Sequence, residues 1–210
     1  MIPKTIQDKL DEGRQYRRVV EIKALDDDMI VEGYATTFNQ PYELWRDGDY
    51  TVLEQVDAHA FDDTDMSDVI MQYDHEGRVF ARLSNGTLEL DADDHGLHVR
   101  ANLGGTEIGR QLYEEIKGGY TDKMSFGFTV SSDEQTVSED YEAKTTTILR
   151  TITGIGKLYD VSAVSLPANN ATEISARSYC EGVIAEAAEE HRKAEERKRK
   201  IRKIQILSEV

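Results

Sequence analysis

Length and charge already restrict the class of protein. The chain has 210 residues, with 25 Lys and Arg against 41 Asp and Glu and a formal net charge of −16. This length allows one domain of about 150 to 180 residues with its own core, plus appendages. The acidic excess argues against a nucleic-acid-binding surface, which needs clustered basic residues, and favours a basic or neutral partner.

The sequence carries no pattern of a targeting signal, a membrane span or a metal site. The N-terminus has no apolar core of signal-peptide length, and no apolar run approaches the roughly 18 residues of a spanning helix. Cys180 is the single cysteine, so no intrachain disulfide can form. No Cys/His spacing resembles a set of metal ligands. We expect a soluble protein of the reducing cytosol, with no membrane contact, no metal and no cofactor.

Short alternating runs dominate the chain from Tyr16 to about Ser178. Their period of two predicts strands at 17–25, 30–38, 69–75, 78–93, 96–103, 123–131 and 145–166. Asn85-Gly86 supplies the residues of a two-residue hairpin loop, and Asp94-His95-Gly96 predicts the next turn.

Helical signals interrupt this pattern. In TEIGRQLYEEIKGG, at 106–119, Thr106 can cap a helix whose apolar residues recur every four positions, and two glycines end it. A shorter helix is expected over DAHAFDDTDM, at 57–66. The first 15 residues are too polar to assign.

The composition changes abruptly after Ser178. The following segment is rich in helix formers, and 192–203 carries eight Lys or Arg against two Glu. Its apolar positions are too sparse for a core-facing stripe, which leaves a solvated protruding helix or a docking element as alternatives.

Three parts are therefore expected: a polar N-terminal segment at 1–15, a domain at 16–178 and a charged helical tail at 179–210. No fixed repeat is present, which excludes a solenoid or propeller. Many short strands with two helices predict a mainly β fold with some α: a closed or nearly closed β-barrel surrounded by helices.

Ser125 is the candidate nucleophile. In DKMSFGFTV, at 122–130, the alternation puts Met124, Phe126 and Phe128 on one face and Ser125 with Gly127 on the other. A serine hydroxyl is a weak nucleophile until a neighbouring base takes its proton, so a histidine must reach it.

His75 is the most suitable of the five histidines. It ends the apolar run VIMQYD just before Glu76 and Gly77, where a strand leaves the core. His59 and His191 lie in charged surroundings, whereas turn and surface-strand roles account for His95 and His98.

Asp160 could orient that base. It opens the alternating run DVSAVS, and a carboxylate at the start of an apolar strand needs a reason. A surface position at the strand end is the alternative.

Several segments together resemble the prohead proteases of tailed bacteriophages, the HK97 type, over about residues 17 to 177. They are EGYATTF, VIMQYDHEGRVFARL, DADDHGLHVRANL, the DKMSFGFTV strand after IKGGY, and LYDVSAVSLPAN, in the order and spacing of that family. The resemblance implies a serine endopeptidase with a fold similar to the herpesvirus assemblins. Its substrate would be scaffold or the scaffold-like part of the major capsid protein, inside the immature capsid in the host cytoplasm. Self-cleavage and a homodimer are further expectations.

By this motif the nucleophile maps to Ser125, the base to His75 and the third member to Asp160, where the family strand usually has Glu. His98 is the alternative third member. Oxyanion donors are expected among backbone N–H groups near Ser125 and Gly127, with Arg150 or Lys157 as possible helpers. The Asp in place of Glu keeps a second class open: a non-catalytic capsid-assembly or scaffold-binding module.

Overall fold

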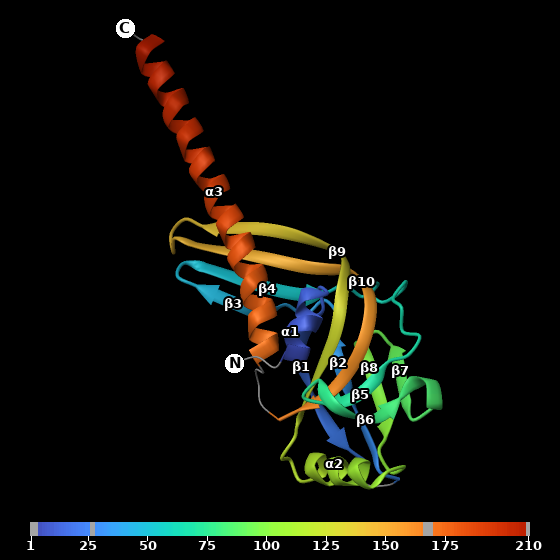
Figure 1. Ribbon diagram of the computed structural model, residues 1–210. Helices are drawn as coiled ribbons and strands as arrows, with labels where there is room; N and C mark the ends of the chain where they lie inside the picture. Colours follow the sequence, from blue (N-terminus) through green and yellow to red (C-terminus); the bar gives the residue numbers. More distant parts are fainter. Residues whose placement is uncertain (1–3, 26–27, 166–169, 209–210) are drawn as a thin grey trace.

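The computed structural model describes residues 4–25, 28–165 and 170–208, which form a large twisted sheet with three α-helices (Figure 1). The elements, in chain order, are α1 (Lys4–Asp11), β1 (Gln15–Ala24), β2 (Ile30–Thr37), β3 (Tyr42–Asp47), β4 (Tyr50–Val56), β5 (Ile70–Tyr73), β6 (Glu76–Arg82), the 3₁₀ turn η1 (Leu83–Asn85), β7 (Leu88–Ala92), β8 (Gly96–Asn102), α2 (Glu107–Lys117), β9 (Lys123–Asp140), β10 (Thr145–Val164) and α3 (Asn170–Ser208).

The long hairpin of β9 and β10 is the central element of the sheet. The strand order is β3-β4-β10-β9-β1-β2-β8-β7, and β5 adds to β10 with β6 beside it. The first half of β10 pairs in parallel with β4 and its second half with β5. Register shifts bend β10 between these halves, since extra residues at a bulge kink and twist a strand.

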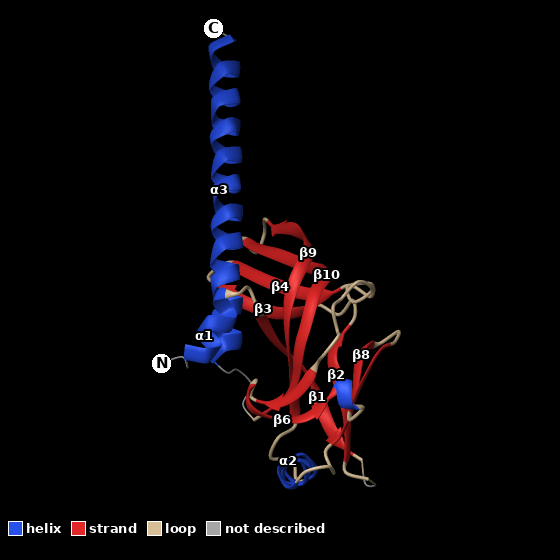
Figure 2. Cartoon of the chain, turned by 45° about the vertical axis from the view of Figure 1, so that its right-hand side comes forward, coloured by secondary structure: helices blue, strands red, loops and turns tan. Residues whose placement is uncertain are grey.

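The predicted closed barrel surrounded by helices is wrong. Within the described residues the sheet runs from β3 at one end to β7 at the other, and these two edge strands do not pair. The bend in β10 sends β3 and β4 away from β7 and β8, which keeps the edges apart. The helices do not surround the sheet: α2 packs across one end, and α3 leans on the β3–β4 side before it extends past the strands (Figure 2).

Most of the predicted strands are confirmed, with shifted boundaries, and position 166 lies outside the described residues. The prediction for 106–119 is also confirmed, because α2 begins after Thr106, whose hydroxyl accepts a hydrogen bond from the Gly109 amide. The hairpin β3–β4 is additional to the predicted elements.

Two local predictions fail because side chains and long-range pairing override the pattern. The helix expected at 57–66 is a series of turns, in which the Asp57 carboxylate accepts from the His59 amide and offers the backbone an alternative to a helix. Asn85-Gly86 closes the turn η1 and joins no hairpin, since β6 pairs with β5 and β7 pairs with β8. The Asp94-His95-Gly96 turn is confirmed by the β7–β8 hairpin.

The apolar core lies on the sheet face that carries Met71, Met124, Phe126, Phe128 and Val161, all fully buried. α2 adds Leu112, Tyr113 and Ile116 to this core. None of the described helices is long and apolar enough to cross a membrane.

A smaller contact attaches the first part of α3 to the sheet. Cys180 and Val183 pack with Val52 of β4 and Ile148 of β10. α3 is continuous from Asn170 to Ser208, and Ser178 lies inside it. The helix then passes the β9–β10 hairpin, where Lys193, Arg197 and Lys198 line a groove with Tyr141. Its last part extends beyond the sheet (Figure 1).

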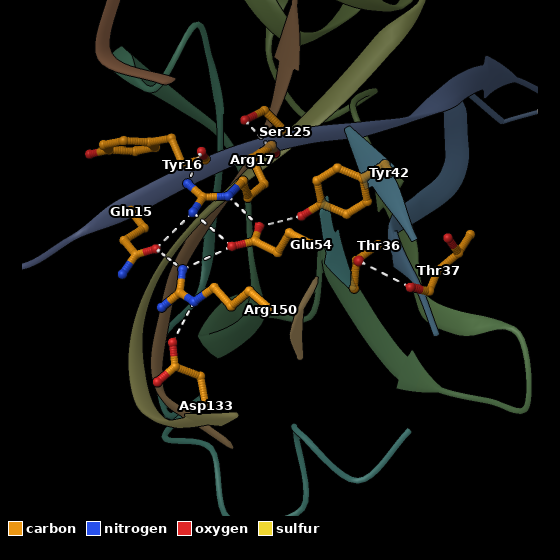
Figure 3. A network of polar contacts seen from close by, with 10 residues as sticks. All are labelled: Gln15, Tyr16, Arg17, Thr36, Thr37, Tyr42, Glu54, Ser125, Asp133 and Arg150. Carbon is orange, nitrogen blue, oxygen red and sulfur yellow. Dashed lines mark hydrogen bonds and ion pairs between the residues drawn. The ribbon is translucent and has the colours of Figure 1, made fainter. Parts of the chain in front are cut away.

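A buried charge cluster joins β1, β4 and β10 (Figure 3). Glu54, which is fully buried, accepts two hydrogen bonds from Arg17, at 2.5 and 3.0 Å, and one from Arg150 at 2.8 Å. The Tyr42 hydroxyl donates to the same carboxylate at 2.5 Å. Burial alone would raise the pKa of Glu54, but Arg17 and then Arg150 outweigh that effect and lower it. Glu54 is therefore ionised and fixes both cations.

Replacing this carboxylate should destabilise the fold strongly at neutral pH. Glu54→Gln removes the carboxylate that two buried guanidinium groups share, and breaking a buried pair costs about 3–5 kcal/mol. Because the Glu54 pKa is lowered by folding, its stabilisation is present above the unfolded-state pKa and is lost as pH falls below about 4. The difference in unfolding free energy between wild type and variant should shrink over that range. Urea denaturation at pH 3 to 7 measures it, with Glu43→Gln, from the exposed pair with Arg46, as a control. An equal loss in both variants would contradict the expectation.

Candidate active site

His75 occupies a strained turn between β5 and β6. The paired residues Tyr73 and Glu76 leave Asp74 and His75 as the two loop residues, with φ of 49° and 62°. A tight hairpin loop of this kind needs positive φ at both positions, which side-chain-bearing residues rarely adopt. The turn is attached to β10, since the Asp74 amide donates to the Ala163 carbonyl at 3.0 Å and the Ser165 amide donates to the Asp74 carboxylate at 3.2 Å.

Strand register places the other two candidate residues on one face of the sheet. Ser162 of β10 lies opposite Ser125 of β9, and Asp160 lies opposite Gly127. Since alternate residues of a strand share a face, Ser125, Gly127, Asp160 and Ser162 lie together, on the face opposite the apolar core. β5 pairs with the same part of β10, which brings the turn with His75 beside them.

The His75 ring bridges Ser125 and Asp160. Its Nε2 lies 2.6 Å from Ser125 Oγ and its Nδ1 lies 2.5 Å from Asp160 Oδ1. An Nδ1–H donated to the carboxylate leaves Nε2 as an acceptor for the serine proton. The structure thus brings all three predicted residues together, in the arrangement that general-base activation of a hydroxyl requires.

The Ser125 hydroxyl has a second neighbour. Its Oγ lies 2.9 Å from the backbone carbonyl of Arg17 (Figure 3). This carbonyl, like the unprotonated Nε2 of His75, can only accept a hydrogen bond. One hydroxyl proton cannot serve both acceptors. When His75 is neutral, its Nε2 accepts the hydrogen bond from the Ser125 hydroxyl. When His75 is protonated, Nε2–H donates to Oγ, and the hydroxyl donates to the Arg17 carbonyl instead.

Two neighbours of Asp160 hold its carboxylate in place. The Ser162 hydroxyl donates to Oδ1 at 2.8 Å, and Gly127 leaves room for Oδ2, which a Cβ at that position would approach to 2.4 Å. Burial alone would raise the pKa of Asp160, but His75 and then Ser162 outweigh it and lower the pKa. The carboxylate stays ionised beside the imidazole. Ser162 was not among the predicted site residues, although the alternation in DVS puts it on the same face as Asp160.

The remaining predicted residues lie elsewhere. His98, the alternative third member, is in β8 and packs edge-on against Tyr34. Arg150 pairs with Glu54 and Asp133, and Lys157 pairs with Asp65 at 2.7 Å. β9 is paired with β1 and with β10 at Ser125 and Gly127, so the backbone N–H groups of this stretch lie in the plane of the sheet.

Gly127→Ala should disturb the carboxylate without altering any polar group. The new Cβ would meet Asp160 Oδ2 at 2.4 Å and Tyr16 Cε1 at 2.9 Å. Overpacking a tight site costs about 1–3 kcal/mol. We expect a loss of that size in urea denaturation. Gly105→Ala is the matched control, because its Cβ meets nothing within 4 Å, and an equal effect in both variants would contradict the close contact at Gly127.

One of three comparisons with known proteins finds a match, to a protein family. The family model described as caudovirus prohead serine protease matches residues 18–190. That range contains Ser125, His75 and Asp160. Searches of curated proteins and of solved structures return no match. Because the family match covers most of the chain, the protein belongs to the caudovirus prohead serine proteases.

Proposed function

We propose that this protein is a serine endopeptidase that cleaves scaffold, or the scaffold-like part of the major capsid protein, and itself during prohead maturation. The observation that carries the proposal is the His75 ring within hydrogen-bond distance of both Ser125 Oγ and Asp160 Oδ1. Family membership supports the setting, an assembling capsid in the host cytoplasm.

Each residue of the triad has one role in the reaction. His75 Nε2 takes the Ser125 proton while Oγ attacks the scissile carbonyl carbon, and the carbonyl oxygen takes up the displaced electron pair. The imidazolium then gives the proton to the leaving amine, and the C–N bond breaks to leave an ester on Ser125. Water attacks this ester with His75 again as base, which releases the second peptide and restores the hydroxyl. Asp160 holds the ring through Nδ1–H and stabilises its charged form.

One observation favours the second candidate, a non-catalytic capsid-assembly or scaffold-binding module. Ser125, His75 and Asp160 are each only 1% exposed, so a substrate cannot reach the hydroxyl in this conformation. A fluorophosphonate probe separates the two candidates, because covalent labelling of Ser125 requires an activated, accessible hydroxyl.

Ser125→Ala should abolish both probe labelling and cleavage of a co-expressed capsid or scaffold substrate. Loss of a triad nucleophile removes several orders of magnitude in rate, whereas a buried Ser→Ala change in a well-packed strand has a small effect on stability. Intact mass spectrometry and capsid-protein termini report the chemistry, and the melting temperature should stay within a degree or two. Ser138→Ala, at an exposed position in the distal part of the same strand β9, is the control. Full cleavage by Ser125→Ala would exclude this residue as the nucleophile.

We further propose that the basic part of α3 attaches the protease to an acidic or coiled-coil partner in the prohead. The segment 192–203 carries eight Lys or Arg against two Glu, and it lies beyond the contact of Cys180 and Val183 with the sheet. A helix with few apolar residues gains little stability from packing on the core. Its exposed basic side chains are suited to bind an acidic surface.

Removing the basic charge should reduce incorporation into capsids and leave peptide hydrolysis unchanged. The exposed residues Arg197, Arg199, Lys200 and Arg202 are replaced together by Gln, which preserves helix propensity. Glu186→Gln with Glu190→Gln, on the same helix, is the control. Quantification of the protease in purified proheads measures the effect, and unchanged incorporation of the fourfold variant would contradict a tether.

A further inference from the structure

The N-terminal part of the chain covers the candidate triad in this structure. Tyr16, at the start of β1, is fully buried, and its ring centroid lies 4.4 Å from that of His75. Tyr16 lies opposite Gly127 in the register of β1 and β9, which puts it on the triad face of the sheet. Since Ser125, His75 and Asp160 are each 1% exposed, a peptide can reach Oγ only if a neighbouring segment moves.

Residues that precede Tyr16 attach to the same place. Lys9, in α1, donates from Nζ to the His75 carbonyl at 2.8 Å. The Arg14 guanidinium lies 3.6 Å above the ring centroid of Tyr159, the neighbour of Asp160. Between them Gly13, with φ of 80°, ends α1 in a left-handed turn in which the Arg14 amide donates to the Lys9 carbonyl. Lys9, Arg14 and Tyr16 therefore contact both the His75 turn and β10.

The hydrogen bonding of this contact is incomplete. Among the described residues, the buried side-chain polar atoms without a hydrogen-bond partner are Arg14 Nε, Tyr16 Oη and Asp160 Oδ2. All three belong to the N-terminal contact or to the triad beneath it. Buried unsatisfied donors and acceptors are costly, so the closed conformation gives up hydrogen bonds that water or a bound peptide would restore. Burial, followed by the Asp160 carboxylate, raises the pKa of Tyr16, which keeps its hydroxyl protonated.

We infer that residues 4–16 form an autoinhibitory cover over the candidate triad, and that this cover must leave before a peptide substrate can bind. The inference rests on the proposed protease function. α1 has only eight residues, a length at which a helix depends on its tertiary contacts. The cover ends at Arg17, since the buried pair with Glu54 holds that residue in β1 (Figure 3). Gln15 and Tyr16, the first two residues of β1, separate from β9 with the cover, and Gln15 gives up the hydrogen bonds that it accepts from Arg17 and Arg150. The strand from Arg17 onward stays in the sheet while the triad is exposed.

The test compares the rate of Ser125 labelling in chains whose cover is weakened. Lys9→Met removes the hydrogen bond to His75 and keeps the length and apolar stem of the side chain. A chain lacking residues 2–13 removes α1 altogether. Lys23→Met, in an exposed lysine near the other end of β1, is the control with the same change of charge. Labelling by a fluorophosphonate probe is followed by intact mass spectrometry, and hydrogen exchange of residues 4–16 is measured on the same samples.

We expect the second-order labelling rate to rise at least tenfold in the truncated chain and severalfold in Lys9→Met, with faster exchange of residues 4–16. Lys23→Met should match the wild type. Equal labelling rates in all four proteins would overturn the cover while leaving Ser125 as a nucleophile. Absence of labelling in every protein, the truncated one included, would overturn the proposed nucleophile and the cover with it. If the truncated chain does not fold, Lys9→Met decides, because it leaves every backbone contact in place.

Discussion

The contact of one imidazole with residues of two strands is the interaction on which the proposed chemistry depends. His75 comes from a two-residue turn whose members both have positive φ, and it meets Ser125 of β9 and Asp160 of β10. A turn of this type is unfavourable for residues other than glycine, and such strain persists where the surrounding structure holds it. Here the Ala163 carbonyl and Ser165 hold the preceding Asp74. The cost of the turn is offset by contacts of β10, the strand that also supplies the carboxylate.

A second polar element fixes β1, the strand on the other side of Ser125, the proposed nucleophile. Arg17 carries the carbonyl next to Ser125 Oγ, and its guanidinium is paired with the buried Glu54. Replacing buried ion pairs by apolar residues is often neutral or stabilising, so such a cluster is better explained by specificity of position than by stability. The Arg17–Glu54–Arg150 cluster ties β1, β4 and β10 into one arrangement. Arg17 also marks the boundary between the strand residues that remain in the sheet and residues 4–16, the proposed cover.

Local patterns predicted the individual positions well. The alternation in DKMSFGFTV put Ser125 and Gly127 on the face opposite the apolar core, and the structure confirms this. The convergence of Ser125, His75 and Asp160 did not follow from any local pattern. It came from the resemblance to the prohead proteases, since a Ser, a His and an Asp occur in almost every chain.

Apart from the helix expected at 57–66, the errors concern contacts between residues distant in the chain. Barrel closure depends on whether the two edge strands meet, and that is decided by the bend of β10 and by β3–β4, a hairpin whose mixed polarity in YELWRD gives a weak strand signal. The positive φ of His75 and the role of Ser162 also depend on neighbours far along the chain. The polar first 15 residues could not be assigned because their helix is anchored through Lys9 to a carbonyl 66 positions away.

The bridging position of His75 is measured most directly by the signal of its own ring proton. In histidine-labelled protein we expect a strongly deshielded, exchange-protected proton on His75 Nδ1, because that nitrogen donates to the buried Asp160 carboxylate. The signal should vanish in Asp160→Ala and persist in Asp62→Ala, which removes the exposed carboxylate beside His59. A His75 ring proton that exchanges freely in the wild type, or one that is unaffected by Asp160→Ala, would contradict the account.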